Sequence, residues 1–173
     1  MNQRLSERLQ IVFDNLNPKQ DVWDFCCDHG YLGGAAYKSQ IFSNIYFVDQ
    51  VDSIIKKLKT RFDQFVLCEN NPSRSYFLCQ SAESLNQAIT GTISITGVGG
   101  LTIYTILSQL SLKKNLKAER IILGPHRDNE KLLMLISDNE NLKQYSLQKK
   151  IAVVEDGRIR DIYIFDLNCV TTV

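Results

Sequence analysis

The stretch Val22-Trp23-Asp24-Phe25-Cys26-Cys27-Asp28-His29-Gly30-Tyr31-Leu32 contains the clearest structural signal in this sequence. It begins as a short apolar strand, passes through small and acidic residues, and enters a helix at Tyr31. In α/β folds, ligands bind beyond the carboxyl ends of parallel strands, where a strand turns into a helix. Small residues there let the backbone approach a ligand, and the carboxylates of Asp24 and Asp28 can accept hydrogen bonds from an amine or a ribose.

The acidic character of this loop indicates which ligand it suits. A loop that cradles phosphates is rich in glycine, has few acids and often carries a lysine. Here two carboxylates lie within five residues and would repel a pyrophosphate. The loop therefore favours a ligand with a positive charge and no phosphate, such as S-adenosylmethionine. The alternative is an ordinary polar turn at the end of a buried strand.

Length and composition indicate a soluble globular protein. The 173 residues are 44% hydrophobic and 23% charged, which suffices for one domain with a real core. The net charge of +1 gives no global attraction to nucleic acid or membranes, so such binding needs a local patch. No stretch approaches the ~20 apolar residues of a membrane span, and the polar N-terminus does not resemble a secretion signal.

The cysteines favour a reducing compartment. None forms a CxxC pair, and no histidine lies at zinc-ligand spacing from them, so we expect no metal and a cytoplasmic location with free thiols. A catalytic pair of Cys27 and His29 is the less favoured alternative, because residues two apart on a turn seldom face each other. The cysteines are Cys26, Cys27, Cys68, Cys79 and Cys169.

Apolar periodicity predicts a leading helix within residues 1–17 and then alternating strands and helices over 20–173. Near the end, Asp156-Gly157 between two strand-like runs is a strong hairpin signal. We therefore expect one Rossmann-like domain over residues 1–173, with a mostly parallel seven-stranded sheet that ends in an antiparallel hairpin. The predicted strands are 21–25, 45–49, 76–79, 92–96, 120–125, 145–154 and 159–167; the predicted helices after the first lie within 31–38, 51–65, 101–110 and 128–136.

Further candidate ligands follow the other strands. Asp49 follows Gly30 by 19 residues, the separation at which an acid takes ribose hydroxyls in nucleotide-binding βαβ units; alternatively, it caps the next helix. Residues 80–83 after the third strand give a weak signal for an adenine edge. The glycine-rich stretch 97–100 either lines the same site or serves a tight turn and close helix packing.

Other polar residues have plainer interpretations. We expect Asp128 to cap the following helix through its side chain, and His126 before it to be a loop histidine rather than a catalyst. The basic residues on the helix after Asp49 favour a solvated face over contact with nucleic acid. These are Lys56, Lys57, Lys59 and Arg61.

Five motifs, in the same order along nearly the whole chain, resemble those of the TrmK family, bacterial tRNA methyltransferases that act on N1 of adenine 22. The central motif of that family reads D-I-G-S-D-H-A-Y-L-P, and its D-H-x-Y-L string is unusual among methyltransferases. The resemblance implies a class I S-adenosylmethionine-dependent methyltransferase fold. It rests on Leu5-Ser6-Glu7-Arg8-Leu9, Asp24 to Leu32, Thr96-Gly97-Val98-Gly99-Gly100, Arg120-Ile121-Ile122-Leu123-Gly124-Pro125 and Glu155-Asp156-Gly157-Arg158.

The resemblance also implies roles for single residues. Asp28 would stabilise the charge that develops on the methylated base, His29 would orient the loop or the substrate, and Tyr31 would stack on a base. The cofactor, S-adenosylmethionine, would be held by the remaining motif positions and by Asp49 and its neighbour. These cofactor candidates are Arg8, Asp24, Cys26, Gly30, Asp49, Gln50, Ser81, Ala82, Gly97, Val98 and Gly99.

The sequence departs from the family at positions that bear on cofactor and substrate. Cys26 replaces a glycine beside the cofactor, and Gln80-Ser81 replaces G-D, so a hydroxyl stands where a carboxylate usually meets the adenine amine. Gly33 replaces the proline, Val98 a methionine, and Gly124-Pro125-His126 the sequence Q-P-N.

Family members also carry a helical C-terminal domain that helps to hold tRNA, whereas this sequence reads only to Val173. Two alternatives therefore stay open beside a tRNA substrate: a methyltransferase of the same fold acting on another RNA or a small molecule, and a non-catalytic binding module. Neither the acceptor nor the oligomeric state follows from the sequence.

Overall fold

The computed structural model describes residues 4–66 and 71–168 of the chain, with the side chains of 64–66 left aside. Residues 1–3, which the predicted leading helix includes, lie outside the described residues. So do Cys68, Cys169 and the side chain of Phe65.

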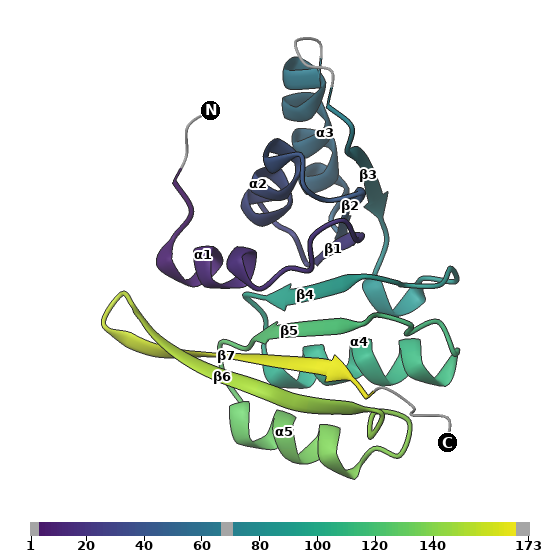
Figure 1. Cartoon of the computed structure of the whole chain (residues 1–173), viewed down its shortest axis with the longest axis vertical. Helices are drawn as coiled ribbons and strands as arrows, with labels where there is room; N and C mark the ends of the chain where they lie inside the picture. Colours follow the sequence, from purple (N-terminus) through teal and green to yellow (C-terminus); the bar gives the residue numbers. More distant parts are fainter. Residues whose placement is uncertain (1–3, 67–70, 169–173) are drawn as a thin grey trace.

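A seven-stranded sheet in the order β3-β2-β1-β4-β5-β7-β6 forms the centre of the molecule (Figure 1). The first five strands are parallel, β7 runs antiparallel to β5, and β6 runs antiparallel to β7. This confirms the predicted sheet and its terminal hairpin. The strands are β1 (Val22–Phe25), β2 (Asn44–Asp49), β3 (Arg74–Cys79), β4 (Thr92–Thr96), β5 (Arg120–Gly124), β6 (Tyr145–Glu155) and β7 (Arg158–Leu167).

Helices cover both faces of the sheet, because the central parallel strands are apolar on both sides. Within β1, Val22 packs into one core cluster while its neighbour Trp23 packs into the other. The first cluster includes residues of α1 (Glu7–Asp14), α2 (Tyr31–Ser39) and α3 (Asp52–Val66). The second includes residues of α4 (Gly100–Leu112), α5 (Asn129–Asp138) and the short 3₁₀ helix η1 (Ala82–Ser84).

The strand boundaries agree with the predicted ones within a residue except at the start of β3, and the differences have physical reasons. β3 begins at Arg74 rather than Tyr76, because its polar first residues carry no apolar signal yet pair with β2 from Asn44 onward. β5 ends at Gly124, before Pro125, since proline lacks an N–H for the sheet. The leading helix α1 begins after Ser6, whose hydroxyl accepts a hydrogen bond from the Leu9 N–H at 3.3 Å.

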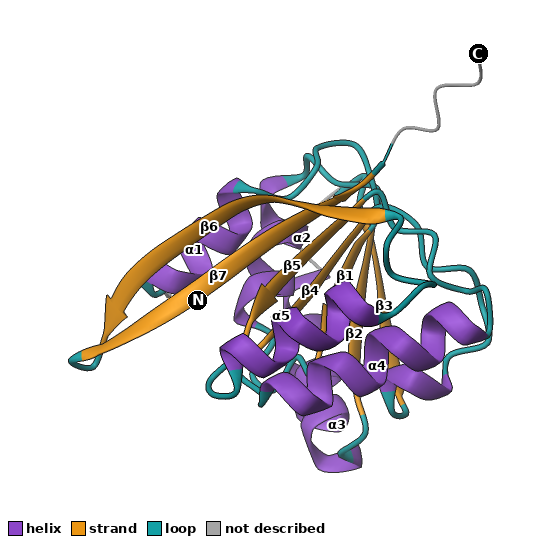
Figure 2. Cartoon of the chain, turned by 90° about the horizontal axis from the view of Figure 1, so that it is seen from below, coloured by secondary structure: helices purple, strands orange, loops and turns teal. Residues whose placement is uncertain are grey.

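The β6–β7 hairpin is longer than the other strands and projects past them (Figure 2). Its turn has left-handed backbone at Asp156 (φ 51°) and Gly157 (φ 69°), as expected for an Asp-Gly hairpin. The turn lies on the side of the molecule that carries α1 (Figure 1). The Arg8 guanidinium of α1 is paired with the Glu155 carboxylate of β6 at 3.0 Å, so the helix and the hairpin are joined.

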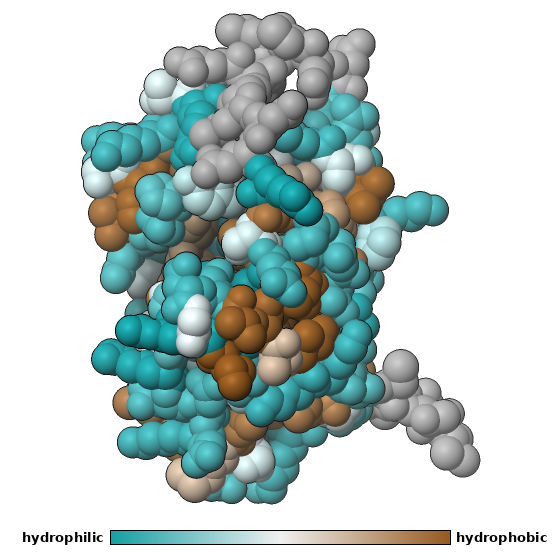
Figure 3. All heavy atoms as spheres, turned by 90° about the vertical axis from the view of Figure 1, so that its left-hand side faces the viewer, coloured by the Kyte–Doolittle hydropathy of each residue, from teal (hydrophilic) through white to brown (hydrophobic). Residues whose placement is uncertain are grey.

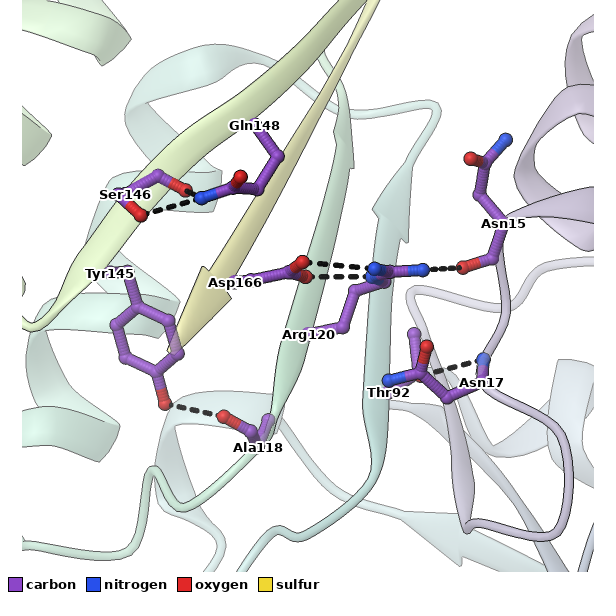
Figure 4. A network of polar contacts seen from close by, with 9 residues as sticks. All are labelled: Asn15, Asn17, Thr92, Ala118, Arg120, Tyr145, Ser146, Gln148 and Asp166. Atoms are coloured by element: carbon purple, nitrogen blue, oxygen red, sulfur yellow. Dashed lines mark hydrogen bonds and ion pairs between the residues drawn. The ribbon is translucent and has the colours of Figure 1, made fainter. Parts of the chain in front are cut away.

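A polar network joins the end of α1 to three strands (Figure 4). Arg120 on β5 donates from Nε and Nη2 to the two carboxylate oxygens of Asp166 on β7, at 2.7 and 2.9 Å. Its Nη1 donates to the Asn15 carbonyl at 3.1 Å, and the Asn17 N–H donates to the Thr92 hydroxyl on β4 at 3.2 Å. The network holds α1 against the sheet at the edge where β4 and β5 begin.

Replacing Arg120 should destabilise the fold more than breaking an exposed ion pair. Arg120→Gln leaves Asp166 and the Asn15 carbonyl without their donors, so we expect the free energy of unfolding in urea to fall by about 1–2 kcal/mol. Lys143→Gln, which removes the exposed Lys143–Glu140 pair, should cost less than about 0.5 kcal/mol. Equal effects of the two substitutions would contradict the role of the network.

Candidate active site

A cavity of about 490 Å³ opens beside the carboxyl ends of β1, β4 and β5, and the start of α1 forms one of its walls. Seven of the predicted site residues line it: Arg8, Asp24, Cys26, Asp28, His29, Tyr31 and Gly97. The other predicted residues lie outside its lining: Gly30, Asp49, Gln50, Ser81, Ala82, Val98 and Gly99. The remaining lining residues are Arg4, Leu5, Ser6, Leu9, Cys27, Leu32, Thr96 and His126.

The loop after β1 owes its shape to alternating left-handed residues, with φ of 55° at Cys26, 43° at Asp28 and 63° at Gly30. The Gly30 N–H donates to the Cys27 carbonyl at 2.6 Å and so closes the turn into α2. A Cβ at Gly30 would lie 2.5 Å from Cδ2 of Leu58, so only glycine fits there without a shift. The close approach that requires glycine at residue 30 is therefore between this backbone and Leu58 of α3.

Asp24 places a buried carboxyl group in the cavity wall. Its Oδ2 accepts a hydrogen bond from the Gly33 N–H at 3.0 Å, which a proline at that position could not donate. Burial raises the pKa of Asp24 to about 7, the Gly33 hydrogen bond opposes this, and the charge of Asp49 raises it further. A cation bound beside Asp24 would favour its ionised form, so the carboxyl is suited to an amine or sulfonium ligand.

Asp49 at the end of β2 holds two loops together. Its Oδ2 accepts from the Asp28 N–H at 3.3 Å, and its Oδ1 accepts from the Val51 N–H at 3.0 Å, one residue before α3 begins. Asp49 therefore does bind a backbone N–H at the start of α3, as the alternative helix-capping role predicts. Each carboxylate oxygen has a further lone pair, so a ribose hydroxyl can still be bound.

Asp28, His29 and Tyr31 lie together on the cavity wall. The Asp28 Oδ2 is 3.6 Å from the His29 Nε2, and both side chains are 65% exposed. The rings of His29 and Tyr31 lie 5.3 Å apart between centroids, tilted by 31°. A carboxylate, an imidazole and a phenol are thus accessible to a substrate in the cavity.

Sequence reasoning missed Arg61, which we expected on a solvated face. Its Nη2 donates to the His29 carbonyl at 2.9 Å and so ties α3 to the loop that carries Asp28. The lysines of the same helix are exposed, and Lys56 pairs with Asp52 at 2.7 Å. Only the fold brings Arg61 to this loop, since the two are 32 residues apart.

The two cysteines of the loop are poor nucleophiles. Cys27 is buried in the core cluster of α1, α2 and α3, and burial raises its pKa. Burial also raises the pKa of Cys26 to about 11, with further contributions from Asp49, Asp24 and Glu83. Because the thiolate is the reactive form, this geometry gives no support to a Cys27–His29 pair.

The residues expected around the cofactor's ribose and adenine follow β2 and β3, whose last residues Asp49 and Cys79 are direct neighbours. Gln50 is exposed, Ser81 precedes η1, and Ala82 is buried in the core. Ala82 of η1 belongs to the core cluster against which Cys26 of the first loop packs. This segment is thus at the same sheet edge as the cavity, although it does not line it.

The glycine-rich stretch 97–100 serves both of the roles predicted for it, because one part lines the cavity and the other part packs closely. Gly97 has φ 82° and lines the cavity, and no described atom lies within 4 Å of where its Cβ would be. Val98 packs against the core, and a Cβ at Gly99 would lie 3.2 Å from Nε of Arg127. Gly97 therefore faces the cavity, whereas the residues after it serve packing.

Asp128 occupies the N-cap position of α5, so the predicted position of the cap is confirmed and the predicted side-chain hydrogen bond is not. Asp128 precedes α5 with φ 62°, and its side chain makes no capping hydrogen bond within the described structure. The left-handed backbone directs the carboxylate elsewhere, 3.7 Å from Nε of Arg127. His126 does lie in a loop, as expected, but it also lines the cavity.

Residues 4–66 and 71–168 contain no group of three or more His, Cys, Asp or Glu side chains that could hold a metal ion. None of the helices in these same ranges is long and apolar enough to cross a membrane.

The raised pKa of Asp24 predicts a pH-dependent stability. Between about pH 4 and pH 7 the folded protein holds a proton that the unfolded chain has lost, so stability falls as the pH rises. Asp24→Asn keeps an oxygen for the Gly33 N–H and removes this charge. We expect the free energy of unfolding of Asp24→Asn, taken relative to that of the unmodified protein, to rise by about 2 kcal/mol from pH 5 to pH 8. Urea denaturation at each pH would measure it.

The exposed Asp63 on α3 supplies the control. Asp63→Asn should leave the pH profile of stability parallel to that of the unmodified protein. If the pH profile of Asp24→Asn were also parallel to that of the unmodified protein, the carboxyl of Asp24 would be ionised at little cost. The argument for a cationic ligand would then lose its support.

Comparison with known proteins shows the family of this chain. The sequence matches a family model described as a methyltransferase domain over residues 5–163. A search of curated proteins found no match. Among solved structures, the Bacillus subtilis tRNA m1A22 methyltransferase TrmK has a TM-score of 0.79 and 22% identity, over 95% of this chain and 67% of that one.

Two further solved structures contain ligands. Streptococcus pneumoniae Sp1610 in complex with S-adenosyl-L-methionine has a TM-score of 0.71 and 19% identity, over 98% of this chain and 76% of that one. M. capricolum TrmK in complex with S-adenosyl-homocysteine has a TM-score of 0.70 and 19% identity, over 96% of this chain and 70% of that one. At these identities the structures show a shared fold, and the family match carries the assignment: the chain belongs to the methyltransferase domain family.

Proposed function

We propose that this protein binds S-adenosylmethionine and transfers its methyl group to N1 of an adenine in tRNA. The observation that carries the proposal is the cavity at the carboxyl ends of the strands, where Asp24 and Asp28 lie together with His29 and Tyr31. The methyltransferase family match and the folds of the tRNA m1A22 methyltransferases support it.

The residues of the cavity fit the cofactor. The buried Asp24 carboxyl would meet the positively charged methionine part, backed by Cys26, and the open space at Gly97 would admit the cofactor close to the backbone. Asp49 and Gln50 would bind the ribose hydroxyls at the end of β2. Ser81 and Ala82 would meet the adenine. Gly30, Val98 and Gly99 would shape the surrounding backbone. Arg8 would act from the helix beside the cavity.

The cofactor would supply an activated methyl group on a sulfonium. The N1 lone pair of adenine is already nucleophilic, so the protein needs no strong base. Methylation leaves a positive charge on the base, and the Asp28 carboxylate is placed to stabilise it as it develops. His29 would orient Asp28, Tyr31 would stack on the base, and an adenine in a helix would first have to leave its stack.

Asp28→Asn should lower turnover by about 10²–10³-fold, because it removes the charge that stabilises the methylated base. The side chain is 65% exposed, so the melting temperature should change little. Labelled-methyl transfer to bacterial tRNA would measure the effect, with Asp52→Asn on the exposed start of α3 as the matched control. An unchanged rate in Asp28→Asn would remove this residue from the mechanism.

Cofactor binding tests the proposal most directly. Calorimetric titration of S-adenosylmethionine should show micromolar affinity, and Asp49→Ala should weaken it at least about tenfold by removing the ribose acceptor, or about 1.4 kcal/mol. Asp49 also holds the loops, so circular dichroism must first confirm that the variant is folded.

Each result of the titration has a clear meaning. Binding without methyl transfer to tRNA would favour the alternative of a methyltransferase with another acceptor. No binding at millimolar cofactor would mean that the cavity does not accept it, and the chain would then be a non-catalytic member of the family.

A further inference from the structure

Helix α3 carries two cations on the flank that lies beside the loop after β1. Lys57 and Arg61 are four residues apart, so they are neighbours on one side of the helix. Nη2 of Arg61 donates to the carbonyl of His29, a residue of the cavity wall, at 2.9 Å. Lys57 and Arg61 therefore form a basic strip that begins at the cavity and continues along α3.

The acids of α3 lie on the other flank of the helix. At about 3.6 residues per turn, Asp52, Lys56, Lys59 and Asp63 all point away from the basic strip. Lys56 pairs with Asp52 at 2.7 Å, the one ion pair that α3 makes among the described residues. Lys57 is exposed, and its ammonium group has no partner within that part of the chain. The charges of the other flank thus balance one another, whereas those of the strip are not compensated.

Two uncompensated cations in a row fit the backbone of a nucleic acid. Phosphates recur along a strand, so each cation can meet its own phosphate and the two need not converge on one anion. Contacts of this kind come from lysine and arginine and position a nucleic acid without reading its bases. The Arg61 guanidinium is already oriented by its bond to the loop, so ordering it on a phosphate costs less entropy than ordering a free side chain.

The hairpin side of the cavity offers no comparable path. The β6–β7 turn is joined to α1 by the pair of Arg8 and Glu155, and it carries Val154 and Ile159, which are paired in register and are 66% and 72% exposed. Figure 3 shows an apolar patch bordered by hydrophilic residues on this side of the molecule. Apolar side chains have no donors for a phosphate. A backbone that leaves the cavity is therefore favoured along α3.

We propose that Lys57 and Arg61 bind the phosphodiester backbone of the RNA next to the nucleotide whose base enters the cavity. This inference rests on the proposed function as an RNA methyltransferase. The base would meet Asp28 and Tyr31, and the adjoining backbone would cross the loop at His29 and follow α3. Two of the four basic residues that the sequence assigned to a solvated face are thereby assigned to the substrate.

The test compares tRNA binding among variants of α3. Lys57→Gln should weaken the affinity for bacterial tRNA at least about threefold at low salt and reduce the slope of log K against log salt by about 1, because one phosphate contact is lost. The double variant with Arg61→Gln should reduce the slope by about 2. Lys57 is exposed, so Lys57→Gln should fold normally and bind S-adenosylmethionine as the unmodified protein does.

Lys59→Gln is the matched control, because it removes the same charge from the same helix on the flank that holds Asp52 and Asp63. Equal losses of tRNA affinity in Lys57→Gln and Lys59→Gln would mean diffuse attraction and would overturn the strip. So would a tRNA affinity that Lys57→Gln leaves unchanged, or a failure of the unmodified protein to bind tRNA at low salt.

Methyl transfer separates this inference from the proposed function. If tRNA binding depends on Lys57 but no labelled methyl reaches the tRNA, the proposed function fails and the strip stands. If the methyl is transferred and Lys57→Gln binds tRNA as tightly as the unmodified protein, the strip fails and the proposed function stands.

Discussion

The carboxylate of Asp49 is the contact on which the arrangement of the site depends. It accepts hydrogen bonds from the backbone N–H groups of Asp28 and Val51, so it joins the loop after β1 to the start of α3. Its charge also raises the pKa values of Asp24 and Cys26. One residue at the end of β2 thus holds the backbone of Asp28 in place and adds to the effect of burial on the pKa values of Asp24 and Cys26.

This dependence explains how the loop tolerates an unfavourable backbone. Cys26 and Asp28 both have positive φ, a conformation that costs a residue with a side chain roughly 1–2 kcal/mol. Such strain persists only where the surroundings over-determine it, and it concentrates at functional sites. Here the hydrogen bonds of Asp49 and Gly30 hold the loop from both sides. The neutral thiol of Cys26 then occupies the cavity wall without adding a charge.

Short-range patterns were enough to predict the sheet. Apolar runs, their spacing and the Asp-Gly turn are local signals, and they led to the seven strands and to the hairpin at the end. The motif after β1 likewise pointed to the residues that line the cavity. Residue type likewise predicted Asp128 as the N-cap residue of α5, but it does not reveal the left-handed backbone there, at which the side chain makes no capping hydrogen bond within the described structure.

The long-range contacts beside the cavity were beyond the reach of such patterns. Arg160 and His126 are 34 residues apart, and Arg8 and Glu155 are 147 apart, so these contacts exist only in the folded chain. Arg61 reaches His29 in the same way. In a sequence each of these residues is simply a charged residue on an exposed face, and only tertiary packing gives it a partner.

The joining of α1 to the hairpin has a consequence for the shape of the cavity. Because Glu155 engages Nε of Arg8, it fixes the guanidinium, whose Nη1 is buried and has no hydrogen-bond partner among the described residues. The ion pair between helix and hairpin therefore sets the position of the helix that forms one wall of the cavity.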